Sequence, residues 1–233
     1  MRGHLHIITL AIRDISLIFN KIGFSVATGP ELETEFYNFD ALNIPADHPA
    51  RDMQDTFWIK TKENEEKKVL RTHTSSIQVR YMERIKDTPQ PFKIIMPGKV
   101  YRNEATDATH EAQFHQVEGL YVNKMASMAE LKGTLEFFFK EFLGPEAKIR
   151  FRPSYFAFVE PGVEVDVWWN DRWLEVFGAG LVHPDVMQYA GFNPDEWKGF
   201  AFGGGIDRLV LLRYGIDDIR HLYSGDLRLI DQF

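Results

Sequence analysis

Two short segments of the sequence combine basic, acidic, amide and aromatic side chains at spacings that suit a ligand site. YRNE places Arg102 and Glu104 two residues apart, and FHQVEG spaces Phe114, Gln116 and Glu118 in the same way. Residues i and i+2 of a β-strand point to the same face of the sheet. If both segments are strands, one surface carries a guanidinium, two carboxylates, an amide and a ring. A solvated sheet face with cross-strand ion pairs would produce the same pattern.

A glycine-rich turn is the sharpest local feature of the sequence. In FAFGGGIDR, three glycines at 203–205 follow an apolar run, and Arg208 opens the next segment. Glycines let the backbone approach a ligand closely. A guanidinium fixed beside them can hold phosphate oxygens in a fork geometry. The spacing does not fit the GxGxxG pattern of dinucleotide-binding folds. Taken alone, an ordinary strand-to-helix turn with an exposed arginine explains the segment equally well.

Two further segments carry weaker signals. RTHTSSIQVR places His73 and Ser75 just before an expected helix, whose N-terminus could hold a carboxylate. A plain capping turn explains that pattern better on local grounds. SYFAFVEPG places Phe156 and Phe158 on one face of an expected strand. Core aromatic residues are the ordinary interpretation of that pair.

The elements that must position these residues follow from hydrophobic periodicity and turn signals. Gly23 is expected to end the first helix, and Asn170-Asp171 to form a hairpin turn. Helix first, then antiparallel strands with inserted helices, is an α+β pattern with a single domain over 1–233. We expect helices at 5–22, 76–87 and 127–143, a strand, Pro-Gly turn and strand over 91–104, strands at 114–123, 148–159, 163–170 and 172–182, and strand, glycine turn and helix over 200–215.

Composition limits the class of protein. The 233 residues are 44% hydrophobic, enough for one sizeable core. No apolar run approaches the ~20 residues of a membrane span, so no membrane partner is expected. The absence of Cys excludes disulfides and thiolate metal sites, and favours a cytoplasmic protein. The formal net charge of -7 does not indicate nucleic-acid binding, so any RNA contact must be local or shared with a partner.

The motifs occur in one order, and together they resemble class II aminoacyl-tRNA synthetases. GFSVATGP, ending at Pro30, is similar to motif 1 of that class, RNE with FHQVEG to motif 2, and GGGIDR to motif 3. The finer resemblance is to phenylalanyl-tRNA synthetase α subunits, through NFDALNIPADHPARD, LRTHTS, ATDATHEAQFHQVEGL, YFAFVEPG and GAGLVHP. It runs from about residue 3 to the end. Two departures are Ser76, where the family usually has Pro, and Asp207, where motif 3 usually has Glu.

The resemblance implies a fold, an activity and partners. The fold would be the class II catalytic domain, an antiparallel sheet flanked by helices, without the family's N-terminal coiled-coil arm. The activity would be ATP-dependent activation of L-phenylalanine as its adenylate and transfer to tRNA(Phe). ATP would be a substrate, with Mg²⁺ bound beside it. A larger β subunit would complete an α2β2 heterotetramer.

The resemblance also implies roles for particular residues. Arg102 and Arg208 would be the catalytic residues, holding the α- and γ-phosphates of ATP. Glu160 would bind Mg²⁺, with Glu175 as second choice. Glu104, His110 and Phe114 would complete the ATP site, and the phenylalanine site would comprise His73, Ser75, Gln116, Glu118, Phe156, Phe158, Val159, Ala201 and Gly203.

Two other functions fit parts of the sequence. A stand-alone ligase could adenylate an aromatic acid without tRNA, which the expected absence of the arm would favour. A non-catalytic, synthetase-like binding module is the other alternative. That alternative predicts loss of the motif arginines, whereas Arg102 and Arg208 are both present.

Overall fold

A mixed sheet forms the centre of the molecule in the computed structural model, which describes residues 3–52, 55–62 and 65–233. Within these residues, seven strands follow the order β1-β5-β6-β10-β9-β8-β7, and only the β1–β5 pair is parallel. This arrangement confirms the expected α+β class. The strands are β1 (Ser25–Val26), β5 (Phe92–Tyr101), β6 (Gln113–Asn123), β7 (Ile149–Phe156), β8 (Val159–Trp169), β9 (Arg172–Val182) and β10 (Lys198–Gly205).

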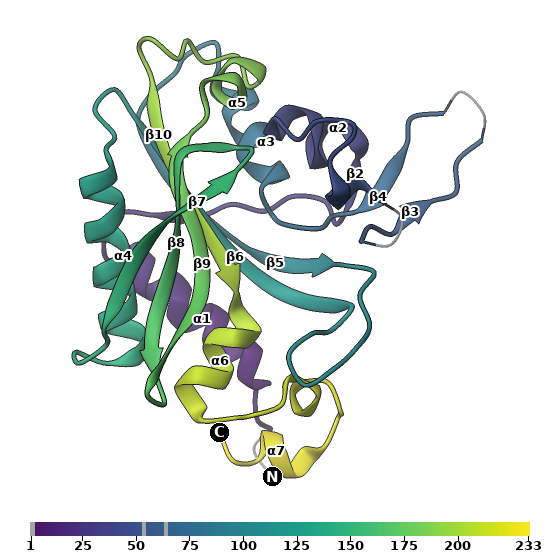
Figure 1. Cartoon of the computed structure of the whole chain (residues 1–233), viewed down its shortest axis with the longest axis vertical. Coiled ribbons are helices and arrows are strands. Elements are labelled where there is room, and N and C mark those ends of the chain that lie inside the picture. The colour runs from purple at the N-terminus through teal and green to yellow at the C-terminus, as the bar shows by residue number, and fades with distance from the viewer. Residues whose placement is uncertain (1–2, 53–54, 63–64) are drawn as a thin grey trace.

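The helices cover both faces of this sheet (Figure 1). The sheet separates two hydrophobic cores, one on each face. Strand β10 shows this, because Phe200 and Phe202 belong to one core and Ala201, between them, belongs to the other. The first core contains helices α1 (Ile7–Asn20), α4 (Met128–Leu143) and α6 (Ile206–Tyr214). The second contains α3 (Ser76–Ile85), the 3-10 helix η1 (Asp40–Leu42) and α5 (Pro184–Tyr189). Of the candidate site residues, Phe156, Phe158, Val159 and Ala201 pack in the second core, whereas Arg208 is carried by α6 of the first.

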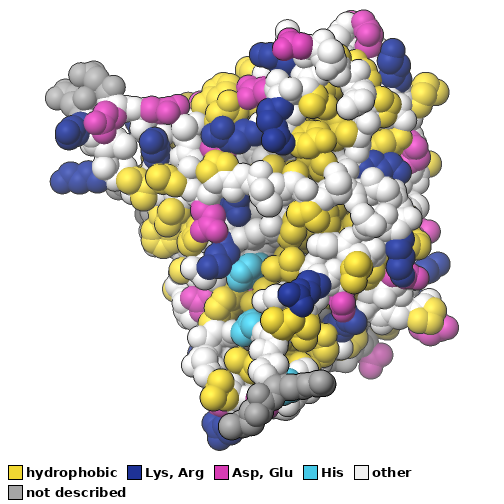
Figure 2. Space-filling model, turned by 180° about the vertical axis from the view of Figure 1, so that it is seen from behind, with side chains coloured by type: hydrophobic (Ala, Val, Ile, Leu, Met, Phe, Trp, Pro, Cys, Tyr) yellow, Lys and Arg dark blue, Asp and Glu magenta, His cyan; other side chains and the backbone are white. Residues whose placement is uncertain are grey.

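A small three-stranded sheet projects from this body (Figures 1 and 2). Its strands are β2 (Leu32–Thr34), β4 (Lys68–Leu70) and β3 (Trp58–Ile59), in that order. Lys and Arg side chains on the face seen in Figure 2 are scattered among acidic and apolar ones. The remaining short helices are α2 (Glu35–Asn38), η2 (Pro49–Arg51), η3 (Ile219–Leu222) and α7 (Leu227–Ile230). None of the helices in the described part of the chain is long and apolar enough to cross a membrane.

Local sequence explains where several elements begin and end. Ser127 caps α4 by accepting from Glu130 N, and its hydroxyl donates to the Glu130 carboxylate. Gly23 follows α1 with φ +87°, a conformation that favours glycine. The hairpin turn between β8 and β9 has φ 46° at Asn170 and 59° at Asp171, as the sequence predicted. The three expected helices are therefore confirmed, with slightly tighter bounds.

The prediction of a turn within 91–104 was wrong, because β5 runs through Pro97 and Gly98 without interruption. The carbonyl of Ile95 accepts from the N–H of Ala27, the residue after β1, where the β1–β5 pairing ends. Pro97, two residues on, directs its nitrogen to the same side, which is the free edge beyond β1. Gly98 leaves room for the guanidinium of Arg71, which an added Cβ would overlap. Both residues therefore suit a strand at this place.

Candidate active site

A cavity of about 480 Å³ lies on the sheet face that carries α3. Its wall brings together the loop after β5, the strands β6, β9 and β10, and the first turns of α3 and α6. Of the residues that the sequence proposed for a site, the cavity contains all except Glu160: His73, Ser75, Arg102, Glu104, His110, Phe114, Gln116, Glu118, Phe156, Phe158, Val159, Ala201, Gly203 and Arg208.

The N-terminus of α3 holds a carboxylate, and that carboxylate belongs to Glu118 of β6. Its Oε1 accepts from Thr74 N at 2.8 Å, and its Oε2 accepts from Ser75 Oγ at 2.5 Å and Gln78 Nε2 at 3.1 Å. Burial raises the pKa of Glu118 above its ordinary value. Gln78 was missed in the sequence, although its place one helical turn after Ser75 puts it on the same side of α3.

Glycines beside Glu118 make room for side chains of the protein itself. Gly203 of β10 is paired with Glu118 on one side and with Gly178 of β9 on the other. A Cβ at Gly203 would overlap Cγ of Glu118, and one at Gly178 would lie 2.8 Å from Cζ of Phe156. The sequence indicated glycines that admit a ligand. The structure adds that Gly178 and Gly203 fix where Phe156 and Glu118 can lie.

Several polar atoms of residues that line the cavity have no hydrogen-bond partner among the described residues. Both ring nitrogens of His73 and Oε1 of Gln116 are buried without a hydrogen-bond partner in the described part of the chain. Burial, assisted by the charge of Arg102, lowers the pKa of His73 to about 3. The imidazole is therefore neutral at physiological pH. Buried polar groups are normally paired, so these atoms suit a polar ligand.

One end of the cavity is apolar. The rings of Phe156 and Phe158 lie 5.9 Å apart between centroids, with planes tilted by 30°. Val159 and Ala201 are buried beside them in the same hydrophobic core. The expectation that both phenylalanines share one strand was wrong, because β7 ends at Phe156 and the next strand begins at Val159. The short turn still brings the two rings together.

The other end of the cavity carries charged side chains of both signs. Arg102 N donates to Ala112 O at 2.9 Å, and the Arg102 guanidinium lies 5.1 Å from the ring centroid of Phe114. Burial lowers the pKa of Arg102. Arg102 and Glu104 do not lie on a strand as expected, because β5 ends at Tyr101. The chain leaves the sheet here and folds over the cavity, so both side chains still line it.

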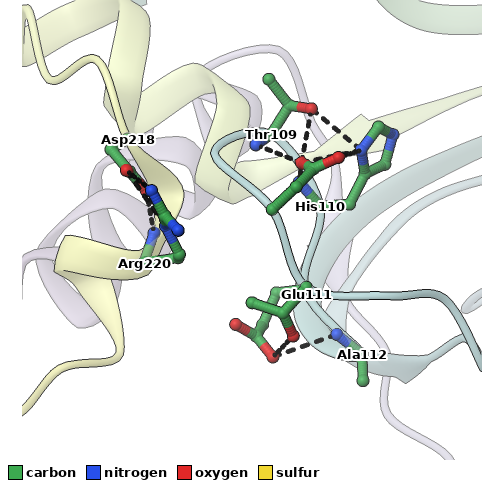
Figure 3. Close-up of polar contacts among 8 residues, drawn as sticks. Thr109, His110, Glu111, Ala112, Asp218 and Arg220 are labelled. Atoms are coloured by element: carbon green, nitrogen blue, oxygen red, sulfur yellow. Dashed lines mark hydrogen bonds and ion pairs between the residues drawn. The ribbon is translucent and has the colours of Figure 1, made fainter.

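A tight turn shapes the loop between β5 and β6 (Figure 3). Asp107 accepts from Thr109 N at 2.6 Å, from Thr109 Oγ1 at 2.8 Å and from His110 N at 2.8 Å. These bonds hold the pKa of Asp107 well below its usual range. The Nδ1 atom of His110 lies 3.1 Å from the same carboxylate. The turn therefore fixes the place of His110 at the cavity wall.

The two proposed metal residues lie in different surroundings. The side chain of Glu160 is 75% exposed, lies 3.5 Å from His183 Nε2, and is not part of the cavity wall. Glu175 does line the cavity, and its pKa is raised by burial and by the charge of Glu164. Across the described residues, no three His, Asp or Glu side chains are grouped so as to hold a metal ion alone.

Comparison with known proteins identifies the class. A family model described as "tRNA synthetases class II core domain (F)" matches residues 1–233, so the chain belongs to the class II tRNA synthetases. Residues of the segments similar to motifs 2 and 3 of that class line the cavity, whereas the motif 1 segment, 23–30, does not contribute to its wall.

Individual relatives narrow the family. The chain is 50% identical over 245 residues to a phenylalanine–tRNA ligase alpha subunit of Halalkalibacterium halodurans, covering 100% of the chain and 70% of the relative. It is similar to the proteins of that name from Synechocystis sp., at 50% over 232 residues (100% and 68% covered), and from Bacillus subtilis, at 49% over 243 residues (99% and 70%). The chain therefore belongs to the phenylalanine–tRNA ligase alpha subunits.

Proposed function

We propose that this chain activates L-phenylalanine with ATP and joins it to tRNA(Phe). One observation carries the proposal: a single cavity combines two arginines, a buried amide and carboxylate, and an apolar aromatic end. This composition suits an amphiphilic amino acid lying next to a nucleotide. Family membership favours this function over an aromatic-acid ligase without tRNA. The presence of Arg102 and Arg208 in the cavity argues against a non-catalytic module.

Phenylalanine would lie with its ring at the apolar end. Edge-to-face contacts with Phe156 and Phe158 add about 0.5–1.5 kcal/mol each beyond burial of area. Glu118 and the unpaired Oε1 of Gln116 would accept from the substrate ammonium. Neutral His73 would supply a ring nitrogen to the same end of the substrate. Around these groups, Ser75, Val159, Ala201 and Gly203 would complete the pocket.

ATP would occupy the charged end, which contains Arg102 and Arg208. Phe114 would stack on the adenine, with Glu104 near its amino group and His110 at the phosphate tail. Arg102 would hold the α-phosphate and Arg208 the γ-phosphate. Both guanidiniums reach the cavity, which is the geometric requirement for these roles.

The first step needs little acid–base chemistry. A carboxyl pKa near about 3–4 leaves the substrate carboxylate ionised at neutral pH, so no general base is required. A carboxylate oxygen attacks the α-phosphorus, the bond to the bridging oxygen breaks, and pyrophosphate leaves with the electron pair. Catalysis is then positioning plus stabilisation of charge on the phosphate oxygens.

Mg²⁺ fits one part of the wall. Glu175 lies in the cavity, and its pKa is raised by burial first and by the charge of Glu164 second, both of which a bound cation would offset. A carboxylate and phosphate oxygens are ligands that Mg²⁺ prefers. We therefore assign Glu175, rather than exposed Glu160, to the metal. The ion would neutralise phosphate charge.

The second step transfers the activated phenylalanine to a ribose hydroxyl of the terminal adenosine of tRNA(Phe). The relatives are named alpha subunits, which supports a β subunit as partner of this chain. We propose an α2β2 heterotetramer as the working assembly. The net charge of -7 agrees with RNA contacts that are local or shared with the partner.

Amino-acid-dependent ATP–pyrophosphate exchange tests this function. We expect exchange with phenylalanine to exceed exchange with leucine or methionine, because only an aromatic ring gains the contacts with Phe156 and Phe158. The assay should be run on the chain alone and with the β subunit. Equal or greater exchange with leucine or methionine would contradict the proposal, as would no exchange in the presence of the β subunit.

A further inference from the structure

Three residues from distant segments form a partly buried, hydrogen-bonded group beside the cavity. Asp207, in the first turn of α6, accepts from His115 N of β6 at 2.7 Å and from the hydroxyl of Tyr223. Tyr223 follows η3 near the C-terminal end of the chain. The hydroxyl of Tyr223 also lies 3.1 Å from His115 Nδ1, and the two rings are nearly parallel. The group therefore joins β6, α6 and the C-terminal segment.

The carboxylate of Asp207 depends on these donors. Its side chain is only 2% exposed, and burial raises its pKa, while the bonds from Tyr223 and His115 oppose that rise. Removing a donor from a buried carboxylate leaves the charge without compensation, which costs more than the bond itself contributes. The position of the first turn of α6 is therefore sensitive to the Tyr223 hydroxyl.

Arg208 follows Asp207 directly and lines the cavity. The glycine turn expected from the sequence is not formed, because Gly203, Gly204 and Gly205 pair with β6 as the end of β10, which passes directly into α6. Arg208 itself is exposed. The position of its guanidinium thus depends on the first turn of α6 more than on bonds of its own. That turn is fixed through Asp207.

The same C-terminal segment also contacts the loop over the cavity. Ile219 N donates to Ala108 O at 3.0 Å, and Ile219 lines the cavity. Asp218 and Arg220 form an ion pair at 2.5 Å on either side of Ile219, next to the loop turn (Figure 3). The segment 218–223 therefore contacts both nucleotide-facing elements, the loop after β5 and the turn that carries Arg208.

We propose that Tyr223 is a positioning residue for the nucleotide site, acting through Asp207 on Arg208. The inference rests on the proposed function, because it takes the ligand at Arg208 to be ATP. The amino-acid end of the cavity lies at α3 and β7, where the Glu118 carboxylate accepts from Thr74, Ser75 and Gln78 rather than from this group. Loss of the Tyr223 hydroxyl therefore weakens the use of ATP and spares phenylalanine.

The variant that tests this is Tyr223→Phe, which removes one oxygen. In pyrophosphate exchange by the complete chain with its β subunit, we expect KM for ATP to rise at least about tenfold. KM for phenylalanine should stay within about twofold. Tyr214→Phe is the matched control, because its ring packs on Phe233 and no hydrogen bond of its hydroxyl is seen in the described residues. It should behave like the parent chain.

A double-mutant cycle with Asp207→Asn separates positioning from general destabilisation. Asp207→Asn alone should also raise KM for ATP, and it serves as the test if Tyr223→Phe does not fold. The double variant should be no worse than the worse single variant, because both changes act on one contact. An unchanged KM for ATP, equal rises for both substrates, or additive effects would overturn the inference. Absence of exchange in the parent chain would instead overturn the proposed function.

Discussion

Gly203→Ala is the substitution for which the structure gives the clearest expectation. Gly203 faces Glu118 across the β6–β10 pair. An added Cβ would overlap Cγ of Glu118 and lie 3.3 Å from both Glu118 Cβ and Val117 O. Glu118 cannot turn away freely, because its carboxylate accepts from Thr74 N, Ser75 Oγ and Gln78 Nε2. The new methyl group must therefore displace either the strand or the carboxylate.

The size of the effect follows from what has to move. Overpacking a well-filled interior costs about 1–3 kcal/mol. Moving Glu118 also breaks at least one charge-assisted hydrogen bond, worth about 1.5–3 kcal/mol. We expect the free energy of unfolding to fall by about 3 kcal/mol or more. Since Glu118 is our proposed ammonium ligand, KM for phenylalanine should rise about 10–100-fold, at 1.4 kcal/mol per factor of ten.

Gly205→Ala is the control for this experiment. A Cβ at Gly205 meets no atom closer than 3.8 Å, and the residue has φ -72°. We expect its free energy of unfolding to change by no more than about 1 kcal/mol, the scale of a helix N-cap substitution. The measurements are urea denaturation and KM for phenylalanine in pyrophosphate exchange. If the two variants lose the same free energy of unfolding and have the same KM for phenylalanine, the absence of a side chain at Gly203 does not make room for Glu118, and the reasoning fails.

Three further variants test other parts of the cavity. Arg208→Ala should slow exchange by about 100–1000-fold, as expected for the loss of one transition-state contact, without changing the melting temperature. An unchanged exchange rate would show that Arg208 is an ordinary surface residue. Ala201→Gly should raise activation of para-chlorophenylalanine relative to phenylalanine by about 10–200-fold, with less gain for tyrosine, whose hydroxyl lacks a partner there; no relative gain would remove Ala201 from the pocket. Burial lowers the pKa of His73 to about 3 in the folded chain, whereas an unfolded histidine has a pKa of about 6.5. Between about pH 6.5 and 3, the unfolded chain therefore binds a proton at His73 and the folded chain does not. Stability should therefore fall as pH drops below 6.5, by up to about 1.4 kcal/mol per pH unit, and His73→Asn should reduce this slope in urea denaturation at pH 4.5–6.5; equal slopes would contradict the burial of His73.

The sequence predicted the elements and motifs well because their signals are local. Helical periodicity located α1 and α4, and the Asn170-Asp171 pair located the β8–β9 hairpin. The candidate residues other than Glu160 converged on one cavity because the motifs lie at strand ends and helix starts that the topology brings together. Chain order and residue type were sufficient for this.

Tertiary contacts could not be predicted in the same way. Pro97 and Gly98 indicated a turn, but their tolerance within β5 depends on a free sheet edge and on Arg71, 27 residues earlier than Gly98 in the chain. The bond between Tyr223 and Asp207 links residues with no local relationship. Glu118 was recognised as a site residue, but its support by α3 is visible only in the structure. Such contacts are set by packing rather than by local preference.

The most direct test of the central claim is the transfer of radiolabelled phenylalanine to tRNA(Phe) by the chain assembled with its β subunit. We expect acid-precipitable phenylalanyl-tRNA to form only when ATP is present. Replacement of both Arg102 and Arg208 by Ala should abolish its formation while the assembly persists. Vigorous pyrophosphate exchange without any charged tRNA would contradict the account, and would assign the chain to ligases that adenylate an aromatic acid without tRNA.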